Sequence, residues 1–319
     1  MNTSNPASGN SSTIGEVCVE DGSIKKKILP VLYSLMFIAS ILMNSAAAWI
    51  LSRQQSGANL IIYLKNIVAA DLLTAVTLPV EVLTNVFSDN VHLAGIRCRF
   101  SAVIFYSSTY IGILFFGAIS LDRYIKIVKP TRARFVKRRS FAIVASFAIW
   151  LSQLFISLPN TILTLYSPLE NKTIRCTMMK SELGKQWHRY SVSTCMIIFW
   201  IVLVLLVISY FSISMKIYKS YQKLQQKIRR AQLRLYRNIC CIVLVFCICF
   251  VPYHICRIPY LSSQFQTKSR RCRHGTLYLA KELTLVVATL NICMNPLIHF
   301  LLCKPFSVHD LCPKLGNKK

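Results

Sequence analysis

The sequence predicts an all-α membrane protein, a seven-transmembrane helix bundle followed by a short cytoplasmic amphipathic helix. Apolar residues make up 54% of the 319 residues, and the mean hydropathy of +0.48 is high for a water-soluble chain. These residues form seven long blocks instead of alternating with polar ones. A bilayer core about 30 Å thick needs about 20 helical residues at 1.5 Å each. The ten-residue alternating strands of membrane β-barrels do not describe the blocks.

In chain order, the predicted spans cover residues 28–51, 60–86, 96–119, 141–165, 192–210, 239–260 and 277–302. They divide the chain into an extracellular tail (1–27), a seven-helix domain (28–303) and a short cytoplasmic tail (304–319). Residues 1–22 are polar and lack the pattern of a cleavable signal, so the first helix is expected to act as its own targeting signal. The sequons at Asn2, Asn10 and Asn171 are candidate glycosylation sites.

The distribution of charge indicates the orientation. With the N-terminus outside, 22 of the 38 basic residues fall on the inner side, opposed there by Asp122 and Asp310. This agrees with the positive-inside rule and places the C-terminus in the cytoplasm. The other 16 basic residues face outward against eight acids, so the outer mouth is also electropositive and favours an anionic ligand.

The net charge of +27 would suggest a nucleic-acid-binding protein if the chain were soluble. Here the basic residues lie in the gaps between apolar blocks, as loops beside a bilayer do, so no nucleic-acid partner is expected. The sequence also contains no paired carboxylate site, no nucleophile with an adjacent base and no metal-ligand spacing. These patterns predict a binding protein in a lipid bilayer, not an enzyme.

Four of the 13 cysteines, Cys18, Cys98, Cys176 and Cys272, fall in outward segments where disulfides persist. Four cysteines allow three pairings. A Cys98–Cys176 bond would hold the loop after the fourth helix across the mouth, and a Cys18–Cys272 bond would tie the N-terminal tail to the last outer loop. We expect these two pairs.

Several motifs occur in order at the depths expected for one receptor family. They are Asp122-Arg123-Tyr124 at the inner end of helix three, Leu64 to Asp71 in helix two, Trp150 in helix four, Cys249-Phe250-Val251-Pro252 in helix six, and Asn295-Pro296-Leu297-Ile298-His299 in helix seven. From about residue 28 to 306, the chain resembles the rhodopsin-like (class A) G-protein-coupled receptors.

This resemblance implies a switch. A charge in a span costs about 2.5–3.5 kcal/mol, so Asp71 and Arg123 should have a function. Asp122 would neutralise Arg123 locally until Arg123 swings to meet Tyr210 and a G protein, as helix six moves outward at Pro252. Asn44, Asp71, Asn291 and Asn295 would form a polar cluster that holds an allosteric sodium ion; no other cofactor is expected.

The residues of the predicted ligand-binding half of the bundle indicate which receptor subgroup the chain resembles. Phe105 stands where amine receptors carry Asp, and Thr289 stands where opsins carry the retinal lysine, so neither class fits. His254, Arg257 and Tyr260 share one helical face, and Lys281 lies at comparable depth on helix seven. Arg, Lys, His and Tyr together are suitable donors for phosphate oxygens.

This half resembles the purinergic nucleotide receptors of the inhibitory-G-protein-coupled subgroup for ADP and UDP-sugars, and several runs are most similar to the UDP-glucose receptor. The resemblance implies that Tyr106 stacks on the base and that Asn160 and His188 bond base or sugar. Lys180 would reach down from the second outer loop, and Arg257, Tyr260, Gln264 and Lys281 would take the phosphates, with Tyr110, His254 and Glu282 also in the site. Glu282 is the nearest candidate counter-ion for Lys281.

Five positions depart from the pattern. Glu81 stands where the subgroup carries Lys, so Glu81→Lys is expected to raise the potency of UDP-sugars or ADP. In the pocket, Val192 also replaces an Asn. On the signalling side, Gly112 removes a hydroxyl from the sodium cluster, His299 replaces Tyr, and Asn295 replaces the subgroup's Asp. Cys303 and Cys312 in the tail are candidates for palmitate or are free thiols.

The expected function is therefore a plasma-membrane receptor for an extracellular nucleotide or nucleotide sugar that signals through a Gi-type G protein. The alternatives are an ADP receptor, and a lysophospholipid or orphan receptor of the same fold. A seven-helix organic-anion transporter is more remote, because the sequence shows no inverted repeats.

Overall fold

The computed structural model describes residues 24–54, 59–88, 90–129, 138–164, 176–177, 179–221, 226–265 and 271–302. Within 24–25, 220–221, 226–240, 263–265, 271–275 and 299–302 it describes the helix but not the side chains. The predictions for Asn2, Asn10, Asn171, Cys18–Cys272, Cys303, Cys312 and the short amphipathic helix lie outside this description, as do the side chains of Gln264 and His299.

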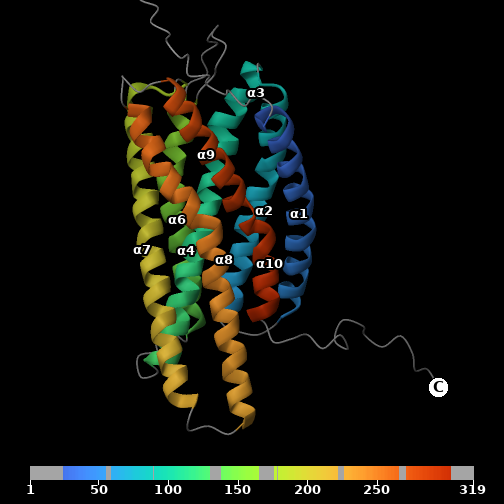
Figure 1. Ribbon diagram of the computed structural model, residues 1–319, viewed down its shortest axis with the longest axis vertical. Coiled ribbons are helices and arrows are strands. Elements are labelled where there is room, and N and C mark those ends of the chain that lie inside the picture. The colour runs from blue at the N-terminus through green and yellow to red at the C-terminus, as the bar shows by residue number, and fades with distance from the viewer. Residues whose placement is uncertain are drawn as a thin grey trace, which may run out of the picture.

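Seven stretches of the described chain are long and apolar enough to cross a membrane, which confirms the predicted fold class. Figure 1 shows them side by side in one bundle. The helices are η1 (Ile24–Ile28), α1 (Leu29–Arg53), α2 (Asn59–Val86), α3 (Val91–Ile96), η2 (Arg97–Ser101), α4 (Ala102–Val128), α6 (Arg139–Ile162), α7 (Glu182–Tyr221), α8 (Gln226–Phe265), α9 (Arg271–Thr289) and α10 (Asn291–Leu302).

The bundle is apolar outside as well as inside. Phe155 on α6 is 72% exposed and Phe211 on α7 is 67% exposed, whereas Phe199 and Phe115 are completely buried. Large exposed apolar side chains on every span are expected in a bilayer, because contact between these side chains and lipid tails costs no free energy. α4 packs against α2, α6 and α7 and forms the centre of the bundle.

The fifth and sixth helices are longer than predicted. α7 begins at Glu182 and ends at Tyr221, and α8 runs from Gln226 to Phe265, so both project beyond the other helices at one end (Figure 1). Hydropathy marks only the part of a helix that lies in lipid. The polar, Lys- and Arg-rich extensions keep the backbone hydrogen bonds of a helix without an apolar signal.

The seventh span is interrupted. α9 ends at Thr289, Leu290 forms a turn, and α10 begins at Asn291. The amide of Cys293 donates to the carbonyl of Leu290 at 3.0 Å, a tighter turn than in a regular α-helix. Pro296 lacks a backbone donor and its ring crowds the preceding turn, which bends helices in this way.

Two links hold described residues of the segment between α6 and α7. Cys98 in η2 is bonded to Cys176, as expected, at a sequence separation of 78 residues. Thr164, just after α6, forms an antiparallel β-bridge with Lys180, just before α7. The loop is therefore held to the third span at one point and returned to the end of α6 at another.

Candidate functional site

Glu81, which the sequence marked as a charge reversal in the pocket, is paired. Its Oε2 accepts from Nε of Arg97 at 2.8 Å, and the Glu81 and Arg97 side chains are 11% and 28% exposed. Tyr33 on α1 lies within electrostatic reach of both residues and of Glu282. An acid that is already neutralised does not repel a polyanion as an isolated one would. The expectation of an unfavourable negative charge at this position was therefore incomplete.

Lys281 is also paired. Its Nζ lies 2.5 Å from Oε1 of the adjacent Glu282, and both residues are buried. The Lys281 ammonium also lies over the rings of Tyr260, at 5.4 Å, and Tyr278, at 5.1 Å. Glu282, the candidate counter-ion from the sequence, therefore compensates the charge of Lys281, and Lys281 by itself does not require an anionic ligand.

Arg257 on α8 has a different environment. Its guanidinium lies over the Tyr106 ring at 4.9 Å and over the Tyr253 ring at 5.3 Å, and Nη1 donates to the Tyr253 hydroxyl. Aromatic faces stabilise a cation by only about 0.5–2 kcal/mol and leave its net charge in place. Tyr106, the proposed base-stacking ring, is thus in contact with the guanidinium proposed to bind phosphate.

Lys180 joins two other predicted ligand residues into one polar cluster. Its buried Nζ donates to the side-chain and backbone oxygens of Asn160, each at 3.3 Å, and to Thr164 Oγ1 at 3.2 Å. His188 Nδ1 lies 3.3 Å from Asn160 Oδ1. All these partners are neutral. Burial without a counter-ion lowers the pKa of Lys180 to about 8.

The charge distribution across the mouth is therefore uneven. Among the described residues, Arg97 and Lys281 each have a carboxylate partner, whereas no described carboxylate forms an ion pair with Arg257 or Lys180. His188 lies within electrostatic reach of both Lys180 and Arg257. Two ion pairs, Arg97 with Glu81 and Lys281 with Glu282, thus lie toward α2 and α9, whereas Arg257 and Lys180 lie toward α6, α7 and α8 with no carboxylate partner among the described residues.

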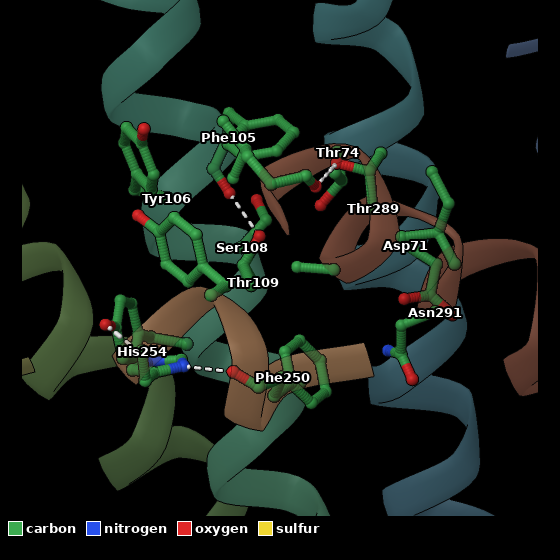
Figure 2. Close-up of a pocket in the computed structure, with 16 residues that line it drawn as sticks. Asp71, Thr74, Phe105, Tyr106, Ser108, Thr109, Phe250, His254, Thr289 and Asn291 are labelled. Carbon is green, nitrogen blue, oxygen red and sulfur yellow. Dashed lines mark hydrogen bonds between the residues drawn. The ribbon is translucent and has the colours of Figure 1, made fainter. Parts of the chain in front are cut away.

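Tyr110 and His254 are brought together but engage each other instead of the mouth. The Tyr110 hydroxyl lies 3.0 Å from His254 Nε2, and His254 Nδ1 lies 2.8 Å from the Phe250 carbonyl, the dashed contact in Figure 2. The imidazole also stacks on Phe199 with centroids 3.5 Å apart. Both ring nitrogens are in use, so the expected role of His254 as a free phosphate donor does not fit this arrangement.

A narrow cavity of about 20 Å³ runs between the mouth and the middle of the bundle, large enough for about one water molecule. Figure 2 shows Tyr106 and His254 on one side of it and Asp71 and Asn291 on the other. Gly112 also lines it, and a Cβ at Gly112 would meet nothing within 4 Å.

The cluster around Asp71 has the composition of a small cation site. Nδ2 of Asn295 donates to both Asp71 oxygens, at 3.0 and 2.8 Å. The side-chain oxygens of Asn44, Asn291 and Asn295 are buried, and none has a hydrogen-bond partner among the described residues. Orphaned buried oxygens near a carboxylate are the ligands that hard cations prefer. The residues present therefore fit the expected sodium ion.

At the inner end, the partner of Asp122 differs from the one expected. Lys126, one turn along α4, donates to Asp122 Oδ2 at 2.8 Å, and none of the described carboxylates forms an ion pair with Arg123. Asp122 Oδ1 and Arg123 Nε are both buried without a hydrogen-bond partner in the described part of the chain. Oδ1 of Asp122 and Nε of Arg123 are thus available to an activation switch, whereas Oδ2 of Asp122 is engaged by Lys126. Tyr210 and Phe250 are buried in the core.

The motifs of helices two and four also meet. Trp150 Nε1 donates to Asn66 Oδ1 at 2.8 Å, so two residues 84 positions apart hold α6 against α2. Sequence reasoning missed Arg97, Tyr33 and Tyr253 at the mouth. The sequence places Arg97 at the mouth, because it directly precedes Cys98, but no local pattern indicates that Arg97 faces Glu81.

Known proteins share this architecture and much of this sequence. Residues 43–299 match the family model described as 7 transmembrane receptor (rhodopsin family). Human purinoceptor 13 is 39% identical over 292 residues, covering 92% of this chain and 82% of the relative. Bovine purinoceptor 14 is 40% identical over 298 residues, covering 93% and 88%. Mouse G-protein coupled receptor 87 is 38% identical over 281 residues, covering 88% and 78%.

Proposed function

The chain belongs to the rhodopsin family of seven-transmembrane receptors, and on this basis we propose that it binds an extracellular nucleotide or nucleotide sugar and signals through a Gi-type G protein. It is a multi-pass plasma-membrane receptor and not an enzyme. Relatives named as purinoceptors support the ligand class. The family match also favours a receptor over the organic-anion transporter. The described basic residues at the Asp-Arg-Tyr end support a cytoplasmic C-terminus.

One observation carries the ligand proposal: Arg257 and Lys180 have no carboxylate partner among the described residues, and both lie within electrostatic reach of His188. A ligand with adjacent phosphates would supply the missing negative charge. Arg257 would donate as a planar fork and Lys180 as a point charge. Tyr106 lies directly against Arg257, so a base stacked on its ring would keep its phosphates within reach of the guanidinium.

The two ion pairs of the mouth suit the uncharged part of the ligand. Glu81 with Arg97 and Lys281 with Glu282 present donors and acceptors but little net charge, and Tyr33 lies beside them. Hydroxyl groups bond to both partners of such ion pairs. This observation favours a nucleotide sugar over a ligand whose anionic groups fill the whole mouth, and an ADP receptor remains the alternative.

A chain of aromatic rings leads from the site toward the core. His254 stacks on Phe199, Phe199 stacks on Phe246 at 5.8 Å, and Phe246 packs against Phe250 at 5.1 Å. Because Arg257 and His254 are one turn apart on α8, a ligand that pulls on Arg257 would also shift this chain. Pro252 interrupts the backbone bonds of α8 next to His254. The proposed response is an outward movement of α8 that opens space for Arg123 to meet the G protein.

We also propose that Asn44, Asp71, Asn291 and Asn295 hold a sodium ion. Such an ion would stabilise the arrangement in which the Asp71 cluster is closed. It would therefore oppose agonist binding by mass action.

The test compares Arg257→Ala and Lys180→Ala with Lys185→Ala, measuring cAMP suppression in transfected cells over a panel of nucleotides at matched surface expression. Lys185 is a control, because it is exposed at the same mouth and paired with Glu182. Losing a charge-assisted bond to a desolvated group costs about 2–5 kcal/mol, so the first two variants should lose at least about thirtyfold in potency. Equal potency of all three variants would mean that phosphate binds elsewhere.

A further inference from the structure

A groove of about 600 Å³ opens on the membrane-facing surface between α4 and α7. Leu121 and Tyr124 form its α4 wall. Its α7 wall consists of Trp200, Ile201, Val204, Leu205, Ile208 and Ser209. From Trp200 to Ser209, this wall follows about 14 Å of helix. The groove is thus elongated along the bundle axis, and its lining is almost entirely apolar.

The groove ends beside a positive charge. The Lys129 ammonium lies over the Tyr124 ring at 5.8 Å from its centroid, and Tyr124 is one of the groove walls. Among the side chains described at this end of the bundle, nine are basic and one is acidic, Asp122, which is engaged by Lys126. The basic residues are Arg53, Lys65, Arg123, Lys126, Lys129, Arg138, Arg139, Lys216 and Lys219. Asp122 therefore does not offset the charge of Lys129.

An apolar groove that faces hydrocarbon is filled by lipid, because there is no water in the bilayer core to fill it. Many lipids could supply an acyl chain. The cation at the groove's end selects among them, since a basic side chain near the surface attracts anionic head groups of the cytoplasmic leaflet. The groove and Lys129 together therefore match one molecule with an apolar chain and an anionic head group.

We propose that this groove is a binding site for an anionic phospholipid, with one acyl chain along α7 and the head group at Lys129. Tyr124 and Ser209 directly adjoin Arg123 and Tyr210 in sequence. The bound lipid therefore braces α4 against α7 next to the residues assigned to G-protein engagement. This site does not depend on the nature of the extracellular ligand.

Trp200 in the groove wall provides a direct readout. Receptor in nanodiscs is titrated with phosphatidylserine or phosphatidylcholine brominated on the acyl chain, which quenches nearby tryptophan fluorescence. The chain has four tryptophans, so the Trp200 signal is the difference between wild type and Trp200→Phe. We expect this signal to be quenched at a lower mole fraction of phosphatidylserine than of phosphatidylcholine.

Two variants identify the cause. Lys129→Gln should reduce the preference for phosphatidylserine about fivefold, the effect of one basic residue near an anionic surface. Arg53→Gln is the matched control at the same end of the bundle, because Arg53 lies over Trp49 on α1, and it should leave the preference unchanged. In addition, Val204→Phe should fill the groove and reduce quenching by both lipids.

Three outcomes would overturn the proposal. Equal quenching by the two lipids would show that the groove holds annular lipid without selection. An unchanged preference in Lys129→Gln would place the head group elsewhere. Displacement of both brominated lipids by cholesterol, with no advantage for phosphatidylserine, would identify a sterol site.

Discussion

The ion pair between Glu81 and Arg97 predicts that Glu81→Lys destabilises the receptor instead of raising its potency. At 2.8 Å and an effective dielectric of about 20, the two charges attract by about 6 kcal/mol before desolvation. Desolvation cancels much of this, and Arg97 is partly exposed, so a net loss of about 2 kcal/mol is expected. In Glu81→Lys, two cations would face each other across α2 and η2.

Thermal stability of the purified receptor measures this effect, by size-exclusion chromatography after heating. Glu81→Lys should lower the apparent melting temperature by several degrees, and adding Arg97→Glu should recover most of the loss, because the reversed pair attracts again. Glu182→Lys is the control, since Glu182 forms an exposed pair with Lys185 at the same end. Additive losses in the double variant, or wild-type stability of Glu81→Lys, would refute the reasoning.

Three further predictions concern other sites. Because burial lowers the pKa of Lys180 to about 8, its positive charge is present below that pH and lost above it; nucleotide potency should fall as the pH rises through about 8 in wild type but not in Lys180→Arg, and identical profiles would contradict this. Gly112→Ser has room for its side chain and adds a hydroxyl to the cavity beside Asp71, so surface expression should be unchanged while sodium inhibits agonist binding more strongly. Lys126→Gln removes the partner of Asp122 and leaves it free to hold Arg123, so basal nucleotide exchange on the G protein should decrease; an increase would show that the existing pair is the restraint.

The sequence predicted the bundle well because hydropathy is a local property. Each span needs only its own apolar residues, and the bilayer supplies the rest of the constraint. The ends of α7 and α8 were underestimated because polar helix outside lipid has no such signal. Helix bends could be predicted only in part. Pro296 indicates a bend in the seventh span, but the turn itself lies at Leu290.

Charge pairing was predicted less well because it depends on which helix faces which. Glu81 and Arg97 are 16 residues apart and on different helices, so no helical period relates them. Asp122 and Lys126 are four apart, a spacing that does favour an ion pair, but the adjacent Arg123 suggested a different partner. Lys281 and Glu282 are neighbours in sequence, and their contact was the alternative that sequence reasoning had named.

The β-bridge between Thr164 and Lys180 ties a residue just before α7 to a residue just after α6. The backbone of Lys180 is held by the bridge, while its side chain is held separately by Asn160 and Thr164. A phosphate that takes over the ammonium would exchange those side-chain hydrogen bonds and leave the backbone where it is. Binding then requires little ordering of the backbone at Lys180, so affinity is not lost to the conformational entropy of that residue. At this position, ligand entry and release should accordingly depend on rotation of the Lys180 side chain, with the Lys180 backbone staying in place.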